Sequence, residues 1–191
     1  MGKNKEFGRE ILVMGLLSVL ERPEDSDALR AALEKGFGPI RTHTPRQLFQ
    51  WTDYYDSEMG LPIWRSYIEF ESLVDPSLLA AIKLATNDIE EGFAVEGRRR
   101  VNLDPGLLAP GRFVLATTKD RAHRLALKDG IYAELTLIYE KGSFHALPWT
   151  YPDWASEPVR GMLGLAKTDL FLPALKRKRL CRAFIFRESV G

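Results

Sequence analysis

The segment ILVMGLLSVL, residues 11–20, most constrains the fold, because it is a continuous apolar run interrupted only by Gly15 and Ser18. Such a run is typical of a central β-strand that is covered on both faces. It has about half of the roughly 20 apolar residues that a membrane span needs. The segment ERPEDSD follows it, where a signal peptide would have a small-residue cleavage site. We therefore interpret the run as a buried strand and expect a cytoplasmic protein with no membrane partner.

The size and charge of the chain narrow the class of protein further. Its 191 residues suit one domain with a proper core. Lys and Arg number 27 against 26 Asp and Glu, so the net charge of +1 gives no reason to expect a nucleic-acid partner. Cys181 is the only cysteine, which excludes an internal disulfide and a cysteine zinc cluster. Oligomeric state is left open.

Two helices are predicted from capping signals and helical spacing. Pro23 and the acidic residues after it open a helix that ends at the glycines of EKGFG, and Asp75-Pro76 opens a second helix over residues 76–94. The second helix carries an apolar stripe and, beside it, a polar stripe. The apolar stripe is formed by Leu78, Ile82, Ala85, Ile89 and Phe93, and the polar stripe by Lys83, Asn87 and Glu90.

Several extended segments alternate with these helices. WRSYIEFESLV alternates in polarity, and RRRVNLD, RFVLATTKD and IYAELTLIYEKG follow Gly97, with a predicted turn at Pro105-Gly106. The order predicts an α+β fold: a mostly antiparallel sheet with a split β-α-β (ferredoxin-like) core and helices on one face. We expect residues 1–157 to form a single α+β domain and residues 158–191 to form an atypical C-terminal helix or tail.

Six strings considered together resemble a known family. They are TDYYDSEMG, IKLATNDIEEGF, RRRVNLDPGLL, LATTKDRAHR, GIYAELTLIYEKG and LPWTYPDW. Over roughly residues 11–157 the chain resembles domain-of-unknown-function family 4416, an uncharacterised prokaryotic family in which some members are labelled GTP-binding. The resemblance implies a small cytoplasmic protein of unassigned activity. Residues after Pro158 depart from the family pattern.

The motifs that bind GTP are incomplete in this chain. GMLGLAKT, residues 161–168, approaches the phosphate-binding loop, but Ala166 stands where the loop needs its second glycine. No apolar strand precedes it, and Pro173 interrupts the helix that should follow. TTKD, residues 117–120, lacks the spacer residue of the base-reading motif. Neither string supports GTP binding.

Polar residues recur on one face of the later strands. Residues two apart in a strand share a face, so Arg98, Arg100, Asn102 and Asp104 align. If the strands are adjacent, Lys119 or Asp120 and Glu134 lie beside Asn102 and Asp104, with the polar helix stripe at the border. Carboxylates, an amide and basic groups suit a hydrated Mg²⁺ ion and a phosphate ester. A solvated sheet face with cross-strand ion pairs accounts for the same pattern, and both interpretations stay open.

We assign roles to these residues as hypotheses. Asp104 and Glu134 are the predicted catalytic carboxylates and metal ligands for a divalent ion such as Mg²⁺, and His123 is an optional general acid. The predicted ligand-binding residues are Lys83, Asn87, Arg100, Asn102, Lys119, Asp120 and Tyr132.

Two functions compete on this sequence, which leaves open the substrate and whether the protein is an enzyme. The first is binding or processing of a phosphorylated small molecule or nucleotide at the polar sheet face. It predicts that the acids and bases converge in a pocket with at least one buried carboxylate. The alternative is a non-enzymatic binding or adaptor module for a protein or RNA partner. It predicts that these residues lie flat and exposed, while Trp149, Tyr151 and Trp154 form an open patch.

Overall fold

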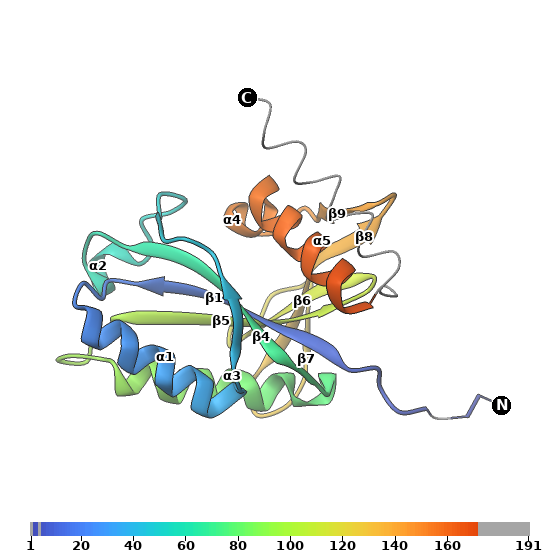
Figure 1. Cartoon of the computed structure of the whole chain (residues 1–191), viewed down its shortest axis with the longest axis horizontal. Helices are drawn as coiled ribbons and strands as arrows, with labels where there is room; N and C mark the ends of the chain where they lie inside the picture. Colours follow the sequence, from blue (N-terminus) through green and yellow to red (C-terminus); the bar gives the residue numbers. More distant parts are fainter. Residues whose placement is uncertain (1, 4, 172–191) are drawn as a thin grey trace.

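The computed structural model describes residues 2–3 and 5–171, and Figure 1 shows one strongly twisted sheet with helices packed on it. The strands are β1 (Glu10–Ser18), β2 (Ile40–His43), β3 (Gln47–Leu48), β4 (Trp64–Val74), β5 (Val101–Ala109), β6 (Arg112–Thr117), β7 (Arg124–Ala126), β8 (Tyr132–Glu140) and β9 (Ser143–Ala146). The helices are α1 (Pro23–Phe37), α2 (Asp56–Met59), α3 (Leu79–Gly92), α4 (Pro152–Ala155) and α5 (Glu157–Phe171), and a 3-10 helix (Pro76–Leu78) precedes α3.

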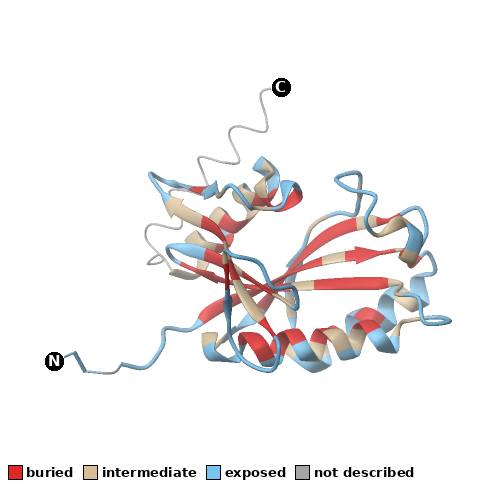
Figure 2. Ribbon diagram, turned by 180° about the vertical axis from the view of Figure 1, so that it is seen from behind, coloured by how far each residue is buried: buried red, intermediate tan, exposed pale blue. Residues whose placement is uncertain are grey.

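The nine strands form one sheet in the order β2-β4-β1-β5-β6-β8-β7, with β3 paired to β4 and β9 paired to β8. Each pairing between these strands is antiparallel, which confirms the predicted antiparallel sheet. β1 lies between β4 and β5 and is buried along most of its length, as its apolar run predicts (Figure 2). On the other side of β4 lies β2.

Helices cover both faces of the sheet, so the prediction of helices on one face is wrong. Leu12 and Met14 of β1 pack in a core with residues of α1 and α3, whereas Ile11 and Val13 pack in a second core with residues of α4 and α5. Because alternate residues of a strand point to opposite faces, an unbroken apolar strand needs cover on both sides. The apolar run of β1 thus already implies a second layer of helices.

The C-terminal helix α5 supplies part of that second layer. Its residues Val159 and Leu163 are buried in the second core. The predicted domain boundary at residue 158 stays a prediction, and the tail over residues 172–191 lies outside the described residues. No helix in the described part of the chain is long and apolar enough to cross a membrane.

The turn predicted at Pro105-Gly106 is wrong, because β5 continues through both residues. They lie in the strand opposite Met14 and Val13, and the hairpin turns after Ala109 instead. The ring of Phe113 packs against Gly106, where a Cβ would also lie 2.8 Å from the carbonyl oxygen of Val114. Glycine inside a strand often marks such a close approach.

We expect Gly106→Ala to lower the free energy of unfolding by about 1–3 kcal/mol, because the added methyl meets a buried ring and a backbone oxygen. Gly111→Ala in the following turn is the matched control, since a Cβ there has open space. Its effect should stay within about 0.5 kcal/mol. Urea denaturation of the two variants and the wild type measures both values, and equal effects at the two glycines would contradict this packing argument.

Candidate functional site

The site lies where the sheet opens between β5 and β6. The pairing of these strands runs from Ala109 to Gly106 and stops there, so the first half of β5 has no β6 partner. Side chains of α3 take the place of β6: Glu90 accepts the N–H of Leu103 (2.8 Å) and Lys83 donates to the carbonyl oxygen of Leu103 (2.8 Å). Both side chains are buried, and their charges lie 3.5 Å apart. On the edge that faces away from β1, the N–H and carbonyl groups of Leu103 are therefore satisfied without a β6 partner.

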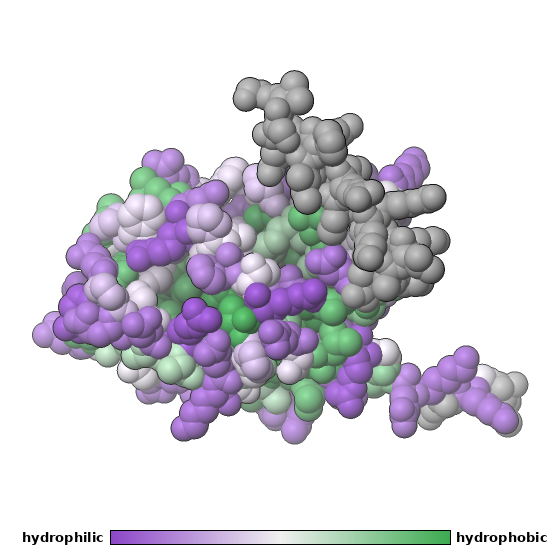
Figure 3. All heavy atoms as spheres, viewed as in Figure 1, coloured by the Kyte–Doolittle hydropathy of each residue, from purple (hydrophilic) through white to green (hydrophobic). Residues whose placement is uncertain are grey.

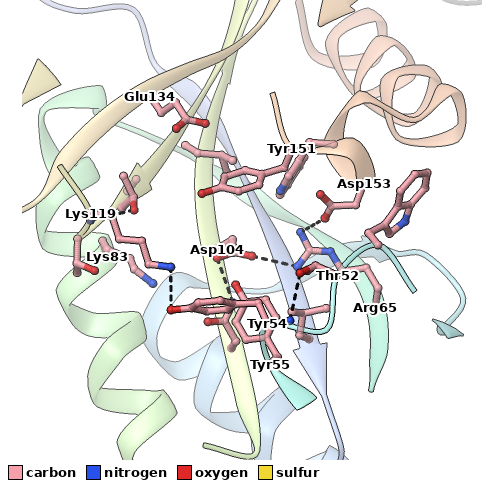
Figure 4. Close-up of a pocket in the computed structure, with 18 of the residues that line it drawn as sticks. Thr52, Tyr54, Tyr55, Arg65, Lys83, Asp104, Lys119, Glu134, Tyr151 and Asp153 are labelled. Atoms are coloured by element: carbon pink, nitrogen blue, oxygen red, sulfur yellow. Dashed lines mark hydrogen bonds and ion pairs between the residues drawn. The ribbon is translucent and has the colours of Figure 1, made fainter. Parts of the chain in front are cut away.

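A cavity of about 640 Å³ occupies this opening. Its walls come from the loop before α2, from β1, β4 and β5, from α3, from β6 and the loop after it, from β7 and β8, and from the segment around α4 (Figure 4). The residues that line it are Leu17, Phe49, Trp51, Thr52, Tyr54, Tyr55, Arg65, Lys83, Asn87, Glu90, Arg99, Asn102, Asp104, Leu115, Ala116, Thr117, Thr118, Lys119, Arg121, Arg124, Glu134, Tyr151, Pro152, Asp153 and Trp154.

Arg65 is a buried cation of the cavity. Its guanidinium lies between Asp104 (3.0 Å) and Asp153 (2.7 Å), as Figure 4 shows. The rings of Tyr67 and Trp154 pack against the same group, with their centroids 4.8 Å and 5.4 Å from its central carbon. Both carboxylates pair with the one buried guanidinium, so the cation at the floor of the cavity is not left unpaired.

Two neighbours complete the surroundings of Arg65. Gly15 of β1 leaves the space for it, since a Cβ at Gly15 would lie 2.6 Å from Nη2 of Arg65. The hydroxyl of Tyr67 donates to Asp153 (3.3 Å), and burial raises the pKa of Tyr67 to about 12. Tyr67 therefore stays a neutral donor at physiological pH.

A second cluster joins β7, β8 and the segment before α4. Arg124 donates through Nε to Glu134 (2.7 Å), through Nη1 to the carbonyl oxygen of Lys119 (2.8 Å) and through Nη2 to the Tyr151 hydroxyl (2.9 Å). His123 lies 3.1 Å from the same oxygen of Glu134, and its ring stacks on Trp149 at 4.9 Å. Arg124 thus fixes three chain segments at one wall of the cavity.

The loop before α2 forms the opposite wall. Lys119 and Tyr54 point toward each other across the cavity mouth: the Lys119 Nζ lies 3.2 Å from the Tyr54 hydroxyl and 4.2 Å from its ring centroid (Figure 4). Tyr55 packs edge-on against Tyr54, and burial, with the charge of Asp104 as the next cause, raises the pKa of Tyr55 well above its ordinary value. Tyr55 therefore presents a neutral hydroxyl.

Arg99 links helix α2 to β5. It binds Glu58 with two hydrogen bonds of 2.6 Å, and its Nη1 also donates to Asn102 (2.8 Å). The amide of Asn102 in turn donates to Asp104 (3.1 Å). This chain of contacts fixes the orientation of both polar residues of β5.

The structure brings together most of the predicted site residues. Lys83, Asn87, Asn102, Asp104, Lys119 and Glu134 line the cavity, and His123 lies behind Glu134. Arg100 is placed elsewhere, 3.7 Å from Asp25 at the start of α1. Asp120 is exposed, and neither it nor Tyr132 belongs to the residues that line the cavity. The catalytic and ligand-binding roles of all these residues stay predictions.

Sequence reasoning missed five charged members of the site: Arg65, Arg99, Arg121, Arg124 and Asp153. The one sequence signal for a functional Arg65 is its position in an otherwise largely apolar half of β4. The predicted alignment of Arg98 and Arg100 with Asn102 fails because β5 begins only at Val101, after a tight turn in which Arg98 pairs with Val95. Arg99 reaches the cavity as a consequence.

The residues do not fit the predicted metal site. Among the described residues no group of three or more His, Cys, Asp or Glu side chains could hold a metal ion. Asp104 and Glu134, the predicted ligands, are each bound to an arginine instead. Arginine occupies one oxygen of each carboxylate, which leaves fewer oxygens for Mg²⁺.

Fold and site together define an α+β protein with a charged cavity in an opened antiparallel sheet. The chain belongs to the family described as domain of unknown function (DUF4416), whose model matches residues 9–169. This confirms the resemblance seen in the sequence, and the match extends past residue 157 into α5. Neither the curated proteins nor the solved structures gave a match to this chain.

Glu90 and Glu58 should affect stability with opposite dependence on pH. Burial raises the pKa of Glu90 from its ordinary 4.5, so its stabilising contribution is present below pH 4.5 and is lost as the pH rises through the folded-state pKa. The hydrogen bonds from Arg99 lower the pKa of Glu58, so its contribution is present above pH 4.5 and is lost as the pH falls.

Denaturation of the wild type, Glu90→Gln and Glu58→Gln between pH 3 and pH 7 checks these signs. The stability of the wild type relative to Glu90→Gln should fall as the pH rises above about 4.5, whereas that relative to Glu58→Gln should fall as the pH is lowered. The same slope for both variants would show that the two carboxyl groups are not held as described.

Proposed function

We propose that the cavity binds a phosphorylated small molecule or a nucleotide. The observation that carries this proposal is an excess of cations: six basic side chains line the cavity against four acidic ones. The basic residues are Arg65, Lys83, Arg99, Lys119, Arg121 and Arg124, and the acidic residues are Glu90, Asp104, Glu134 and Asp153. Such an excess in a concave site favours an anionic ligand.

The excess is concentrated at the mouth of the cavity. Arg65, Lys83, Arg99 and Arg124 are all paired with acids, whereas Lys119 and Arg121 form no ion pair with any described residue. Both follow β6 and are exposed, so a phosphate reaches them without the cost of burying an extra charge. In this proposal the phosphate binds at the mouth, beside the loop that carries Tyr54.

Aromatic side chains favour a ligand that also has a planar part. Trp51, Tyr54 and Tyr151 line the cavity and keep large exposed surfaces, with Tyr54 at 57% and Tyr151 at 44% exposed. Partly exposed rings in a pocket offer faces on which a base can stack. This supports a nucleotide over a small sugar phosphate.

The adaptor alternative finds less support in the geometry. It requires an open patch of Trp149, Tyr151 and Trp154, but Trp154 is 1% exposed and packs in the second core. The acids and bases converge in a cavity, and Glu134 is also 1% exposed. The space-filling view of Figure 3 shows hydrophilic residues over much of this face, with hydrophobic areas near its centre and lower right.

We also propose that strands β2, β4, β1 and β5 form a ferredoxin-like core. The order β2-β4-β1-β5 supports this, because each of the two β-α-β connections, through α1 and α3, spans one intervening antiparallel strand. On this interpretation β6 to β9 extend the core, and the cavity lies at the junction of core and extension. The function that we propose for the cavity is binding of a ligand, and we assign no reaction to it.

A thermal-shift screen of nucleotides and sugar phosphates, followed by calorimetric titration, tests the proposal. We expect Lys119→Met to weaken the binding of the best ligand about tenfold, because it removes a charge-assisted hydrogen bond to phosphate. Lys128→Met is the matched control, as Lys128 is an exposed lysine outside the cavity lining.

The affinity of the wild type should also fall with rising salt, because the contact is partly exposed. Equal affinities of the wild type and both variants would contradict a phosphate site at Lys119. If no compound in the screen stabilises the wild type, the adaptor alternative takes its place.

A further inference from the structure

The two carboxylate oxygens of Glu134 lie in different surroundings. Oε2 receives Nε of Arg124 (2.7 Å) and lies 3.1 Å from Nε2 of His123. Oε1 is buried and has no hydrogen-bond partner among the described residues. A buried acceptor without a protein partner is uncommon in a folded protein and calls for a partner outside the chain, such as an ordered water molecule, an ion or a ligand.

The contacts to Oε2 prevent the carboxylate from turning to satisfy Oε1. Each donor group of Arg124 is engaged, with Glu134, with the Lys119 carbonyl oxygen or with the Tyr151 hydroxyl. The ring of His123 is held parallel to Trp149, at an angle of 10°. An ionised carboxylate only accepts hydrogen bonds, so both neighbours donate to Oε2 and hold it in place.

The carboxylate of Glu134 faces the cavity. Glu134 belongs to the cavity lining, and Figure 4 shows its carboxylate directed toward the ring of Tyr151. A phosphate or carboxylate ligand group offers acceptors only and would be repelled there. A group with N–H bonds would supply the missing donor.

We propose that Oε1 of Glu134 accepts a hydrogen bond from an amino group on the base of a bound nucleotide. This inference rests on the proposed function. Tyr151 supplies a ring beside Glu134, and Lys119 and Arg121 supply the cations for the phosphate. Glu134 then selects nucleotides by a donor on the base, in place of the metal-binding role that the sequence suggested for it.

The variant Glu134→Gln converts this acceptor into a donor. Arg124 and His123 both donate to the Oε2 position, so the glutamine places its carbonyl oxygen there. Its NH₂ group then occupies the position of Oε1, where it faces the amino group of the ligand. Glu69→Gln is the matched control, because Glu69 is a buried carboxylate bound to Arg41 (3.2 Å) and lies outside the cavity lining.

Calorimetric titration with matched ligand pairs tests the inference. AMP differs from purine riboside monophosphate, and GMP from IMP, by one amino group. For the wild type and Glu69→Gln, the amino member of at least one pair should bind about 10- to 100-fold more tightly. In Glu134→Gln this advantage should be lost.

The other possible results of the titration show which of the two proposals, the binding function or the role of Glu134, is wrong. Binding of nucleotides by the wild type with equal affinity within both pairs would overturn the role of Glu134 and leave the proposed function intact. This comparison uses the wild type alone, so it decides even if Glu134→Gln fails to fold. Binding of amino sugar phosphates but of no nucleotide would overturn the base assignment. Absence of binding by every phosphorylated compound would overturn the proposed function itself.

Discussion

The site depends on one interaction, the pair of hydrogen bonds that α3 makes to the backbone of Leu103. Lys83 and Glu90 form hydrogen bonds with the peptide groups of Leu103, where β5 has no β6 partner. The strand β6 can therefore separate from β5 and open the sheet. Burying either charge alone would be costly, and the two are tolerated because each neutralises the other and binds a peptide group. A polar stripe inside α3 is therefore a structural requirement of the cavity.

The remaining charges divide into those that build the cavity and those free to bind. Arg65, Arg99 and Arg124 are each held by at least one carboxylate, and together they fix β4, β5 and β8 around the opening. Such paired groups are preorganised and lose little freedom when a ligand arrives. Lys119 at the mouth keeps its charge for a ligand, with only tyrosine contacts among the described residues.

The sequence predicts those features that depend on local patterns. The apolar run of β1, the two helices and the shared face of Asn102 and Asp104 all follow from periodicity and capping. The partners of Arg65 do not, since Asp104 is 39 residues away and Asp153 lies in helix α4, near the other end of the described chain. Gly106 misled for the opposite reason: its local signal indicates a turn, whereas the ring of Phe113 requires a glycine within the strand.

The central claim, that a ligand binds in the opening between β5 and β6, is tested most directly by an NMR titration. Backbone amide spectra of the wild type are recorded during addition of the compound that stabilises it most. We expect the largest shifts at Leu103, Lys119 and Glu134, while amides of α1, which packs outside the cavity wall, should change little. Large shifts confined to α1 or to other surfaces, with these three amides unchanged, would contradict it.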